Sequence, residues 1–464
     1  MLIAVPLEKL AEAQTTLDRY EAAHSVVGSF TDSRRFRATW RGQQVADLEM
    51  PFLWEACPLD AVSVAEPKRR LEPIKIREPR TELEWATAME RVLTHYHCAD
   101  QSAAGSRFDT TVQGRTAVGP YAGKNHRMPT DLYVSAPLRG KPYGVVATVA
   151  INPFYGEVNP AVMAKLMMIE AITKAVVAGA NYREMVLCDN FYTPRVRPEI
   201  AWDLKQMVEA IADFSTQIRV PFISGKDSSS GTFETVGPLG ERRTIDVPPT
   251  LAVAALARVP DVKKIVTKEF KGVADRIVLV GRADPEALGG SVYADAHFQR
   301  GDRLFDAYDA ASICALWDAL LELHRSGTYV SGSAVAEGGV ALRLFEGCYG
   351  SGLGICVTLD GPVSAFGARR RWPEDQPANG VTERRHNEVR RDGLLFGEFI
   401  GSALIEVPPD SDLGASLDRV PHCIIGKVTA EPRLVLTEAG QVLWEGQTSA
   451  LAESWARTFR EVVE

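Results

Sequence analysis

Residues 224–228 combine side chains that suit a phosphate group and its metal ion. The stretch reads Ser-Gly-Lys-Asp-Ser and follows a short apolar run, so we expect a loop at the end of a strand. Gly225 lets backbone N–H groups approach a phosphate closely, Lys226 can neutralise its charge, and Asp227 can hold Mg²⁺. The spacing is not that of a Walker A loop. On these residues alone, a solvated polar turn is the alternative interpretation.

Two further pairs of polar residues lie beside predicted elements of a sheet. Glu170 precedes Lys174 by four positions, which places both on one face of a predicted helix. Alone, such a pair is a surface ion pair contributing less than ~1 kcal/mol; because its neighbours are apolar, a partly buried functional pair is the alternative. Asp189 and Asn190 follow a predicted strand, where α/β sheets gather ligands. An ordinary Asp/Asn turn is the alternative for them.

Two other motifs carry less specific signals. Residues 112–123, Val-Gln-Gly-Arg-Thr-Ala-Val-Gly-Pro-Tyr-Ala-Gly, are glycine-rich and could cover phosphates. Residues 95–98, His-Tyr-His-Cys, could ligate a metal ion, although such a group on a helix is more typical of surface residues.

The composition excludes several classes of protein. The chain has 464 residues, of which 45% are hydrophobic and 24% charged, and its net charge is -8. This charge argues against a general nucleic-acid binder. No stretch approaches eighteen consecutive apolar residues, so we expect no membrane span. The N-terminus lacks a secretion signal, and seven scattered cysteines indicate buried thiols in a reducing cytoplasm.

The elements that would position these residues begin with a small α/β piece. Residues 1–6 are predicted to be a strand, residues 7–20 a helix, and residues 36–50 a hairpin turning at Arg41 and Gly42. Starting on a strand is typical of the tail of a domain. Residues 67–80 are charged and contain prolines, which indicates a linker.

The centre of the chain alternates strands and helices. Strands are predicted at 144–152, 184–191, 219–225 and 248–259, with a long helix from Pro160 to Gly179 and a second over 198–217. This alternation predicts a layered α/β sheet with helices on one face.

The last part of the chain is predicted to form another α/β unit. It has a strand at 276–282, a helix over 309–327, and then a loop, helix and strand over 332–359. Residues 368–393 carry many charges and few apolar side chains, so they are interpreted as an exposed loop.

Taken together and in this order, the motifs resemble those of one family, formylglycinamidine ribonucleotide synthetase (phosphoribosylformylglycinamidine synthase). The resemblance is to the C-terminal half of that enzyme and covers the chain from Arg107 onwards; residues 1–60 resemble the tail of an earlier domain. It rests on FDTTVQGRTAVGPYAG, VAINPFYGEVNP, EAITKAVVAGA, VLCDNF, PFISGKDS, VPPTLAVAALARVPDVKKIVT, ALGGSVY, AEGGVAL, GSGLG and LLFGE.

The resemblance implies a fold and a domain division. The fold is α/β (α+β), with the two domain types of aminoimidazole ribonucleotide synthetase preceded by a fragment of another C-terminal-type domain. The implied boundaries are 1–66 for that fragment, 67–104 for a linker and helix, 105–262 for the N-terminal-type core domain, and 263–464 for the C-terminal-type domain.

The resemblance also implies a reaction and its components. ATP would activate the formyl amide oxygen of formylglycinamide ribonucleotide, and ammonia would displace the phosphate; Mg²⁺ and cations would neutralise the shifting charge. The implied partners are a first-half chain or pseudo-dimer partner and a glutaminase that delivers ammonia. Asp189, Gly225, Lys226 and Ser228 would contact the nucleotide, and Asp227 and Glu170 would ligate the metal ion.

The chain departs from the family pattern at several polar positions. Ala150 stands where relatives have Asp, Lys174 where they have Asn, and Phe154 where they often have Arg. Ala334 and Ala336 stand where relatives have Asp and Ser. We therefore expect Lys174 to replace the metal ion, with its amine within about 4 Å of a carboxylate at Glu170 and with Asp227 approaching the same place from its loop.

Three functions stay open on the sequence. The chain could be the C-terminal half or a split subunit of the synthetase, which needs a first-half partner for catalysis. It could be a non-catalytic structural subunit of the same complex. It could also be a self-sufficient ATP-dependent enzyme of the same superfamily.

Overall fold

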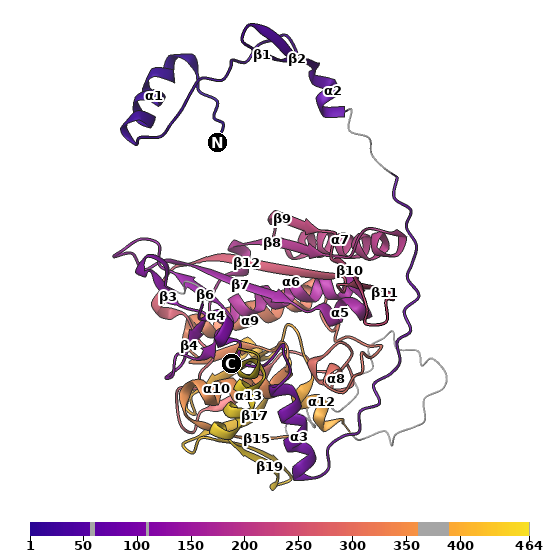
Figure 1. The fold of residues 1–464 in the computed structure, drawn as a ribbon. Coiled ribbons are helices and arrows are strands. Elements are labelled where there is room, and N and C mark those ends of the chain that lie inside the picture. Colours follow the sequence, from indigo (N-terminus) through magenta and orange to yellow (C-terminus); the bar gives the residue numbers. More distant parts are fainter. Residues whose placement is uncertain (56–60, 108–110, 361–388, 464) are drawn as a thin grey trace. The chain divides into compact units, whose positions relative to one another are not determined.

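The structure, a computed structural model, describes residues 1–55, 61–107, 111–360 and 389–463. The chain divides into two compact units, Met1–Ala61 and Val62–Glu464 (Figure 1). In the described part of the chain, no helix has both the length and the apolar content needed to cross a membrane.

The first unit is a helix followed by a β-hairpin, and none of its described residues is buried. The hairpin turns at Arg41 (φ 49°) and Gly42 (φ 80°), which have the left-handed backbone that a two-residue hairpin turn needs. The elements are η1 (Leu7–Lys9), α1 (Leu10–Arg19), β1 (Arg35–Trp40), β2 (Gln43–Glu49) and α2 (Met50–Glu55).

The strand predicted at residues 1–6 does not form: these residues have no regular structure. A strand exists only when a neighbouring strand satisfies its backbone hydrogen bonds. In the described part of the first unit, only β1 and β2 pair with each other.

The second unit contains a six-stranded sheet in the order β3-β6-β7-β12-β8-β9. All its strand pairs are antiparallel except β8 with β9, which is parallel. Its strands are β3 (Thr116–Val118), β6 (Tyr133–Ser135), β7 (Gly144–Ile151), β8 (Met185–Tyr192), β9 (Phe222–Ser228) and β12 (Thr250–Val259). Two small hairpins accompany it: β4 (Tyr121–Ala122) with β5 (Met128–Pro129), and β10 (Thr232–Val236) with β11 (Arg242–Asp246).

Two long helices pack beside this sheet, as the sequence predicts. In α6 (Pro160–Val177), Asn159 caps the first turn and Gly179 follows the end with φ 104°. It packs against β7, β12 and α7 (Pro198–Ile218), and it lies between the two sheets of the unit (Figure 1).

The other face of the six-stranded sheet carries exposed apolar side chains. In β7 buried and less buried positions alternate, so Val146 faces α6 while Val145, Val149 and Ile151 are exposed. The neighbouring β12 places Ala252 and Ala254 opposite Ile151 and Val149. An antiparallel sheet with one buried face normally has a polar outer face, so this apolar face indicates an interaction surface.

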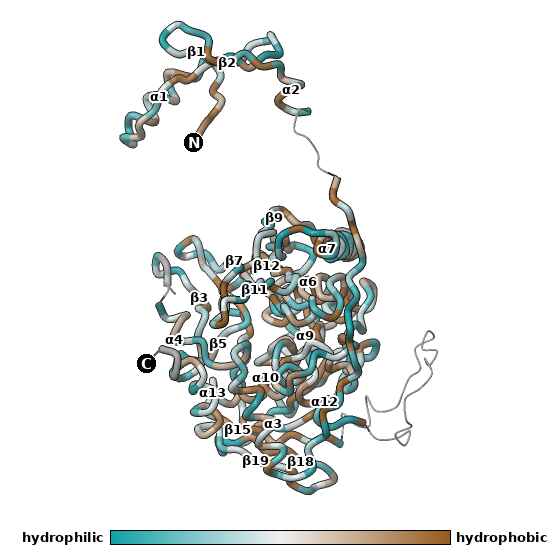
Figure 2. The backbone as a smooth tube through the Cα atoms, turned by 45° about the vertical axis from the view of Figure 1, so that its right-hand side comes forward, coloured by the Kyte–Doolittle hydropathy of each residue, from teal (hydrophilic) through white to brown (hydrophobic). Residues whose placement is uncertain are grey.

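The second sheet of the unit has seven strands in the order β14-β16-β13-β17-β15-β18-β19. These strands are β13 (Arg276–Val280), β14 (Ser331–Ala334), β15 (Gly354–Thr358), β16 (Ala403–Val407), β17 (His422–Thr429), β18 (Arg433–Glu438) and β19 (Gln441–Gln447). The main helices around it are α3 (Glu82–Leu93), α9 (Ala310–Ser326), α10 (Gly339–Ser351), α12 (Arg391–Phe396) and α13 (Thr448–Val463). The short elements of the unit are α4 (Ser102–Gly105), η2 (Val112–Gly114), α5 (Pro153–Val158), η3 (Tyr182–Glu184), η4 (Val262–Lys264), α8 (Val292–Asp295) and η5 (Ala415–Leu417). Figure 2 shows how hydrophobic residues are distributed along the described part of the chain.

Several predicted boundaries differ from the structure. Residues 224–228 were expected to be a loop and belong to β9, while Asp189 and Asn190 lie inside β8 and not after it. The parallel pairing of β8 with β9 continues through these polar residues, because main-chain hydrogen bonds do not depend on side-chain type. Residues 368–388 of the predicted exposed loop lie outside the described residues, and the prediction is wrong for its end, because Arg390 and Asp392 are buried and α12 begins at Arg391.

Candidate functional site

The pair of parallel strands β8 and β9 brings together the residues predicted to contact a nucleotide. Asp189 is directly opposite Gly225 in the register. A Cβ atom at position 225 would lie 2.4 Å from Oδ1 of Asp189, which is closer than any real contact. The carboxylate of Asp189 can therefore lie across the backbone of β9 only because residue 225 is glycine.

Lys226 and Ser228 are the polar side chains of this open edge. The Lys226 ammonium donates to Ser228 Oγ at 2.6 Å and to the carbonyl oxygen of Asp227 at 3.3 Å. Residues Ile223 to Asp227 of β9 are exposed, and β9 is the last strand of the sheet. The exposed edge strand therefore presents a cation and a hydroxyl, Lys226 and Ser228, on one face and the carboxylate of Asp227 on the opposite face.

On the neighbouring strand β8, Asp189 and Asn190 are partly buried, and one of their polar atoms lacks a hydrogen-bond partner among the described residues. Burial raises the pKa of Asp189, although a hydrogen bond from the backbone of Lys226 acts in the opposite direction. Asn190 donates from Nδ2 to the hydroxyl of Tyr192 at 2.7 Å, and its buried Oδ1 has no hydrogen-bond partner among the described residues. A buried acceptor without a partner is uncommon and can accept from a bound ligand.

Glu170 and Lys174 form a separate, enclosed pair on α6. The exposed fractions of their side chains are 0% and 12%, and Lys174 Nζ lies 2.6 Å from Glu170 Oε1. The same ammonium donates to the backbone carbonyl of Val149 on β7 at 2.9 Å. The pair is thus buried under the six-stranded sheet. Asp227, which was expected to approach the same place, lies instead on the exposed strand β9.

Burial sets the electrostatics of this pair. It raises the pKa of Glu170, and the charge of Glu337 adds to this effect, while Lys174 opposes it. For Lys174, burial lowers the pKa, but the carboxylates of Glu170, Glu337 and Asp131 outweigh it and the pKa is raised. The ammonium is therefore held in its charged form beside the carboxylate.

The residues predicted to bind Mg²⁺ do not fit a shared ion. The carboxylate of Glu170 is already paired with Lys174, whereas Asp227 is exposed on β9. Ala150, Ala334 and Ala336, the positions that lack the family's polar residues, are buried and offer no ligand. Within the described ranges, no group of three or more His, Cys, Asp or Glu side chains is arranged to hold a metal ion.

A buried network of charges next to this pair was missed by sequence reasoning. Lys268 contacts Asp131 at 3.0 Å and Glu346 at 2.8 Å. Arg343 contacts each of these carboxylates at 3.1 Å. Only the spacing of Arg343 and Glu346, three apart in an apolar helix, could have indicated part of it. The other members come from segments far apart in the chain.

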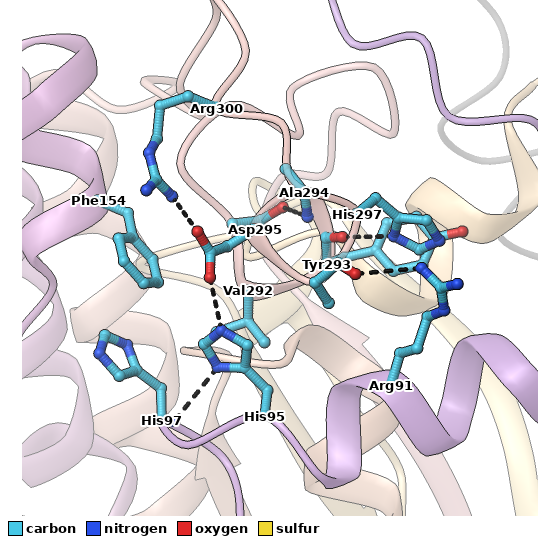
Figure 3. Close-up of polar contacts among 12 residues, drawn as sticks. Arg91, His95, His97, Phe154, Val292, Tyr293, Ala294, Asp295, His297 and Arg300 are labelled. Atoms are coloured by element: carbon cyan, nitrogen blue, oxygen red, sulfur yellow. Dashed lines mark hydrogen bonds and ion pairs between the residues drawn. The ribbon is translucent and has the colours of Figure 1, made fainter.

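The His-Tyr-His-Cys motif, residues 95–98, follows α3, and its first histidine contacts Asp295 at the end of α8 (Figure 3). His95 Nε2 lies 2.8 Å from Asp295 Oδ2, and Arg300 donates to the other oxygen of Asp295 at 2.6 Å. The ring of His97 stacks on Phe154 with centroids 4.6 Å apart, and the guanidinium of Arg300 lies 4.2 Å from the centroid of the same ring.

The geometry explains why His95 is not free to ligate a metal. Its Nδ1 accepts a hydrogen bond from the backbone N–H of His97 at 3.2 Å, so Nε2 carries the proton that is donated to Asp295. Burial raises the pKa of the Cys98 thiol well above its usual value, which keeps it from reacting. His95 is buried, so the alternative interpretation of the motif as surface residues is wrong for this side chain.

No protein-family model matches the chain, but several curated PurL subunits are similar to it. Among curated proteins, phosphoribosylformylglycinamidine synthase subunit PurL of Deinococcus radiodurans is 25% identical over 458 residues, covering 95% of this chain and 55% of the relative. The chain is thus similar to PurL subunits over nearly its whole length. It spans about half the length of the curated relatives it matches.

Solved structures show the same fold. The PurLQS structure from Thermotoga maritima matches with a TM-score of 0.55 and 18% identity, covering 81% of this chain and 52% of that chain. PurL of Thermotoga maritima complexed with ATP matches with a TM-score of 0.50 and 17% identity, covering 79% and 52%. The predicted α/β fold is confirmed, and it is the fold of these PurL structures.

Proposed function

We propose that this chain is the C-terminal half, or a split subunit, of a PurL-type synthase that converts formylglycinamide ribonucleotide to its amidine with ATP and ammonia. Its role is to supply one wall of a nucleotide site that a first-half partner completes. The observation that carries this proposal is the open edge of β8 and β9, where Gly225 makes room for the carboxylate of Asp189.

Each residue of this edge has a role suited to its chemistry. Gly225 keeps the backbone accessible, Lys226 neutralises phosphate oxygens, and Ser228 donates a hydroxyl hydrogen bond. Bound ATP would supply the phosphoryl group that activates the amide oxygen. Asp227 is the one exposed carboxylate among the predicted ligands and would contribute a single oxygen to Mg²⁺, with the other ligands coming from the partner.

The partner would cover the exposed apolar face of the six-stranded sheet. Val145, Val149 and Ile151 on β7 give this face the apolar character of an interface core. The name PurLQS, given to the homologous structure from Thermotoga maritima, indicates an assembly of several subunits. This supports a similar assembly here, with a glutaminase as the source of ammonia.

The enclosed pair Glu170 and Lys174 favours a second candidate function, that of a non-catalytic structural subunit. In this alternative the chain completes the assembly but binds no nucleotide. Because Lys174 already neutralises Glu170, this second region of the chain has no evident place for a metal-bound nucleotide.

An activity assay tests whether the chain needs a first-half partner, which both candidates require. The full chain, a first-half chain and their mixture are each given ATP, formylglycinamide ribonucleotide and ammonia. We expect turnover only from the mixture, because the single chain lacks the groups of the first half. Comparable turnover by this chain alone would contradict the proposal.

The variant Gly225→Ala then tests the open edge within the mixture, with Ser224→Ala on the same strand as control. Because the new Cβ would displace Asp189, we expect the KM for ATP to rise at least about tenfold, a change of roughly 1.4 kcal/mol. Equal KM values for both variants, with the complex still formed, would favour the structural subunit.

A further inference from the structure

The first unit repeats the end of the chain in sequence. When residues 24–43 are placed beside residues 422–441 without a gap, seven positions are identical, and Val26 and Val27 match Ile424 and Ile425. The identical pairs are His24 and His422, Gly28 and Gly426, Thr31 and Thr429, Arg35 and Arg433, Thr39 and Thr437, Gly42 and Gly440, and Gln43 and Gln441.

The two segments also share their local structure. The hairpin β1–β2 corresponds residue by residue to β18–β19, and each has a register shift at the same place, after Ala38 and after Leu436. Both turns have the same left-handed backbone, with φ 49° at Arg41 and φ 49° at Ala439. The following helices, α2 and α13, begin at corresponding residues, Met50 and Thr448.

Even an ion pair across the hairpin is repeated. Arg35 contacts Asp47 at 2.6 Å in the first unit, and Arg433 contacts Glu445 at 3.2 Å at the corresponding positions. The repeat extends further towards the N-terminus, where the Leu-Ile-x-Val-Pro of residues 2–6 matches Leu404 to Pro408 in and after β16. The first unit therefore contains sequence counterparts of β16, β17, β18, β19 and the start of α13.

The environments of the two copies differ completely. Val27 is 77% exposed and its counterpart Ile425 is 2% exposed; Phe30 is 93% exposed and Val428 is 1% exposed. Residues 24–31 have no regular structure, whereas their counterpart is the strand β17. The apolar side chains of the first unit are thus spaced for a sheet interior that the unit does not have.

The strand pairing around residues 404–448, the second copy of the repeat, shows which strands the first unit would need as neighbours. There β17 lies between β13 and β15, β16 lies between β13 and β14, and β18 pairs with β15. The described part of the first unit has no counterpart of β13, β14 or β15. The seven-stranded sheet cannot serve instead, because both sides of β13 and of β15 are already paired.

We propose that residues 1–55 dock by strand insertion into a sheet of the first-half partner, one that carries counterparts of β13, β14 and β15; this inference rests on the proposed function. The register follows from the repeat: Phe36 and Ala38 take the positions of Leu434 and Leu436, which are opposite Ile355 and Val357. Main-chain hydrogen bonds give the affinity. The side chains of Val27 and Phe30, which become buried on docking, give the specificity. This specifies a contact surface for the partner proposed above and does not depend on nucleotide binding.

Hydrogen exchange on the full chain tests the docking. In the free chain, we expect amides of residues 24–31 to exchange rapidly and those of β17 to be protected. When the first-half chain is added, residues 24–31 should become protected while β17 stays unchanged. Equal protection of both segments in the free chain would overturn the proposal, and so would protection that rises with the concentration of this chain alone, which indicates a swapped homodimer.

Two neighbouring substitutions separate insertion from non-specific contact. Val27→Asp would bury an unpaired carboxylate at the position of Ile425, so we expect at least about tenfold weaker binding of the first-half chain. Val26→Asp is the matched control, because its counterpart Ile424 is 44% exposed and faces away from the sheet interior. Equal binding by the two variants would overturn the proposal. Because the readout is assembly and not turnover, it is independent of the test with Gly225→Ala.

Discussion

Lys174 Nζ lies 2.6 Å from the carboxylate of Glu170, and the two side chains are shielded from solvent beneath β7. An ammonium on one turn of a helix thus neutralises a carboxylate on the preceding turn. Since a buried carboxylate without a cation is costly, the lysine does in this chain what a bound metal ion could otherwise do.

Removing Lys174 should be strongly destabilising. We expect Lys174→Met to lower the free energy of unfolding by about 3–5 kcal/mol, because Glu170 is left buried without a cation. The measurement is urea unfolding of the full chain. Lys205→Met is the control: Lys205 forms an exposed pair with Glu209 at 3.4 Å and should change stability by less than ~0.5 kcal/mol.

The double variant Glu170→Gln with Lys174→Met should recover much of the loss, because it removes both charges. If Lys174→Met alone is no worse than Lys205→Met, the pair carries no structural role.

Magnesium should not stabilise the folded chain. Because Lys174 already neutralises Glu170, we expect the unfolding midpoint to be the same in millimolar MgCl₂ and in EDTA. Thermal unfolding followed by circular dichroism measures this. A midpoint that rises with Mg²⁺ in the natural chain but not in Glu170→Gln would show that a metal ion, and not Lys174, is the partner of Glu170.

Acid should weaken the buried network through Asp131. Burial alone would raise its pKa, but Lys268 and Arg343 outweigh burial and lower the pKa to about 2. Because the folded-state pKa is depressed, the stabilisation is complete above the unfolded pKa near 3.8 and is lost as the pH falls towards about 2. We expect the natural chain to lose about 2 kcal/mol more than Asp131→Asn between these pH values. Asp213→Asn, an exposed substitution on α7, is the control and should lose as much stability as the natural chain. If the free energy of unfolding of Asp131→Asn changes with pH in the same way as that of the natural chain, Asp131 does not have this role.

The apolar face of the six-stranded sheet should bind a partner. We expect Val149→Asp to weaken association with a first-half chain at least about tenfold, since the charge would be buried in the interface. Sedimentation velocity measures the association. Leu239→Asp, in the exposed turn between β10 and β11, is the control. A chain that stays monomeric at high concentration and gains no mass with the first-half chain would refute the interface.

The sequence by itself determined the features that depend on neighbouring residues. Pro160 and Gly179 marked both ends of α6, and Arg41 with Gly42 marked the hairpin turn, because helix ends and tight turns are local structures. The separation of four residues also placed Glu170 and Lys174 on one face of that helix, before any tertiary structure was known.

Only the tertiary structure decided which of these segments found partners. Residues 2–6 and Leu404 to Pro408 share the same pattern, yet only the second forms a strand, because β-pairing requires strands that the local sequence does not contain. The same reason explains the enclosure of Glu170: its burial and the charges of Asp131, Lys268 and Arg343 come from segments that meet only when the two sheets pack around α6.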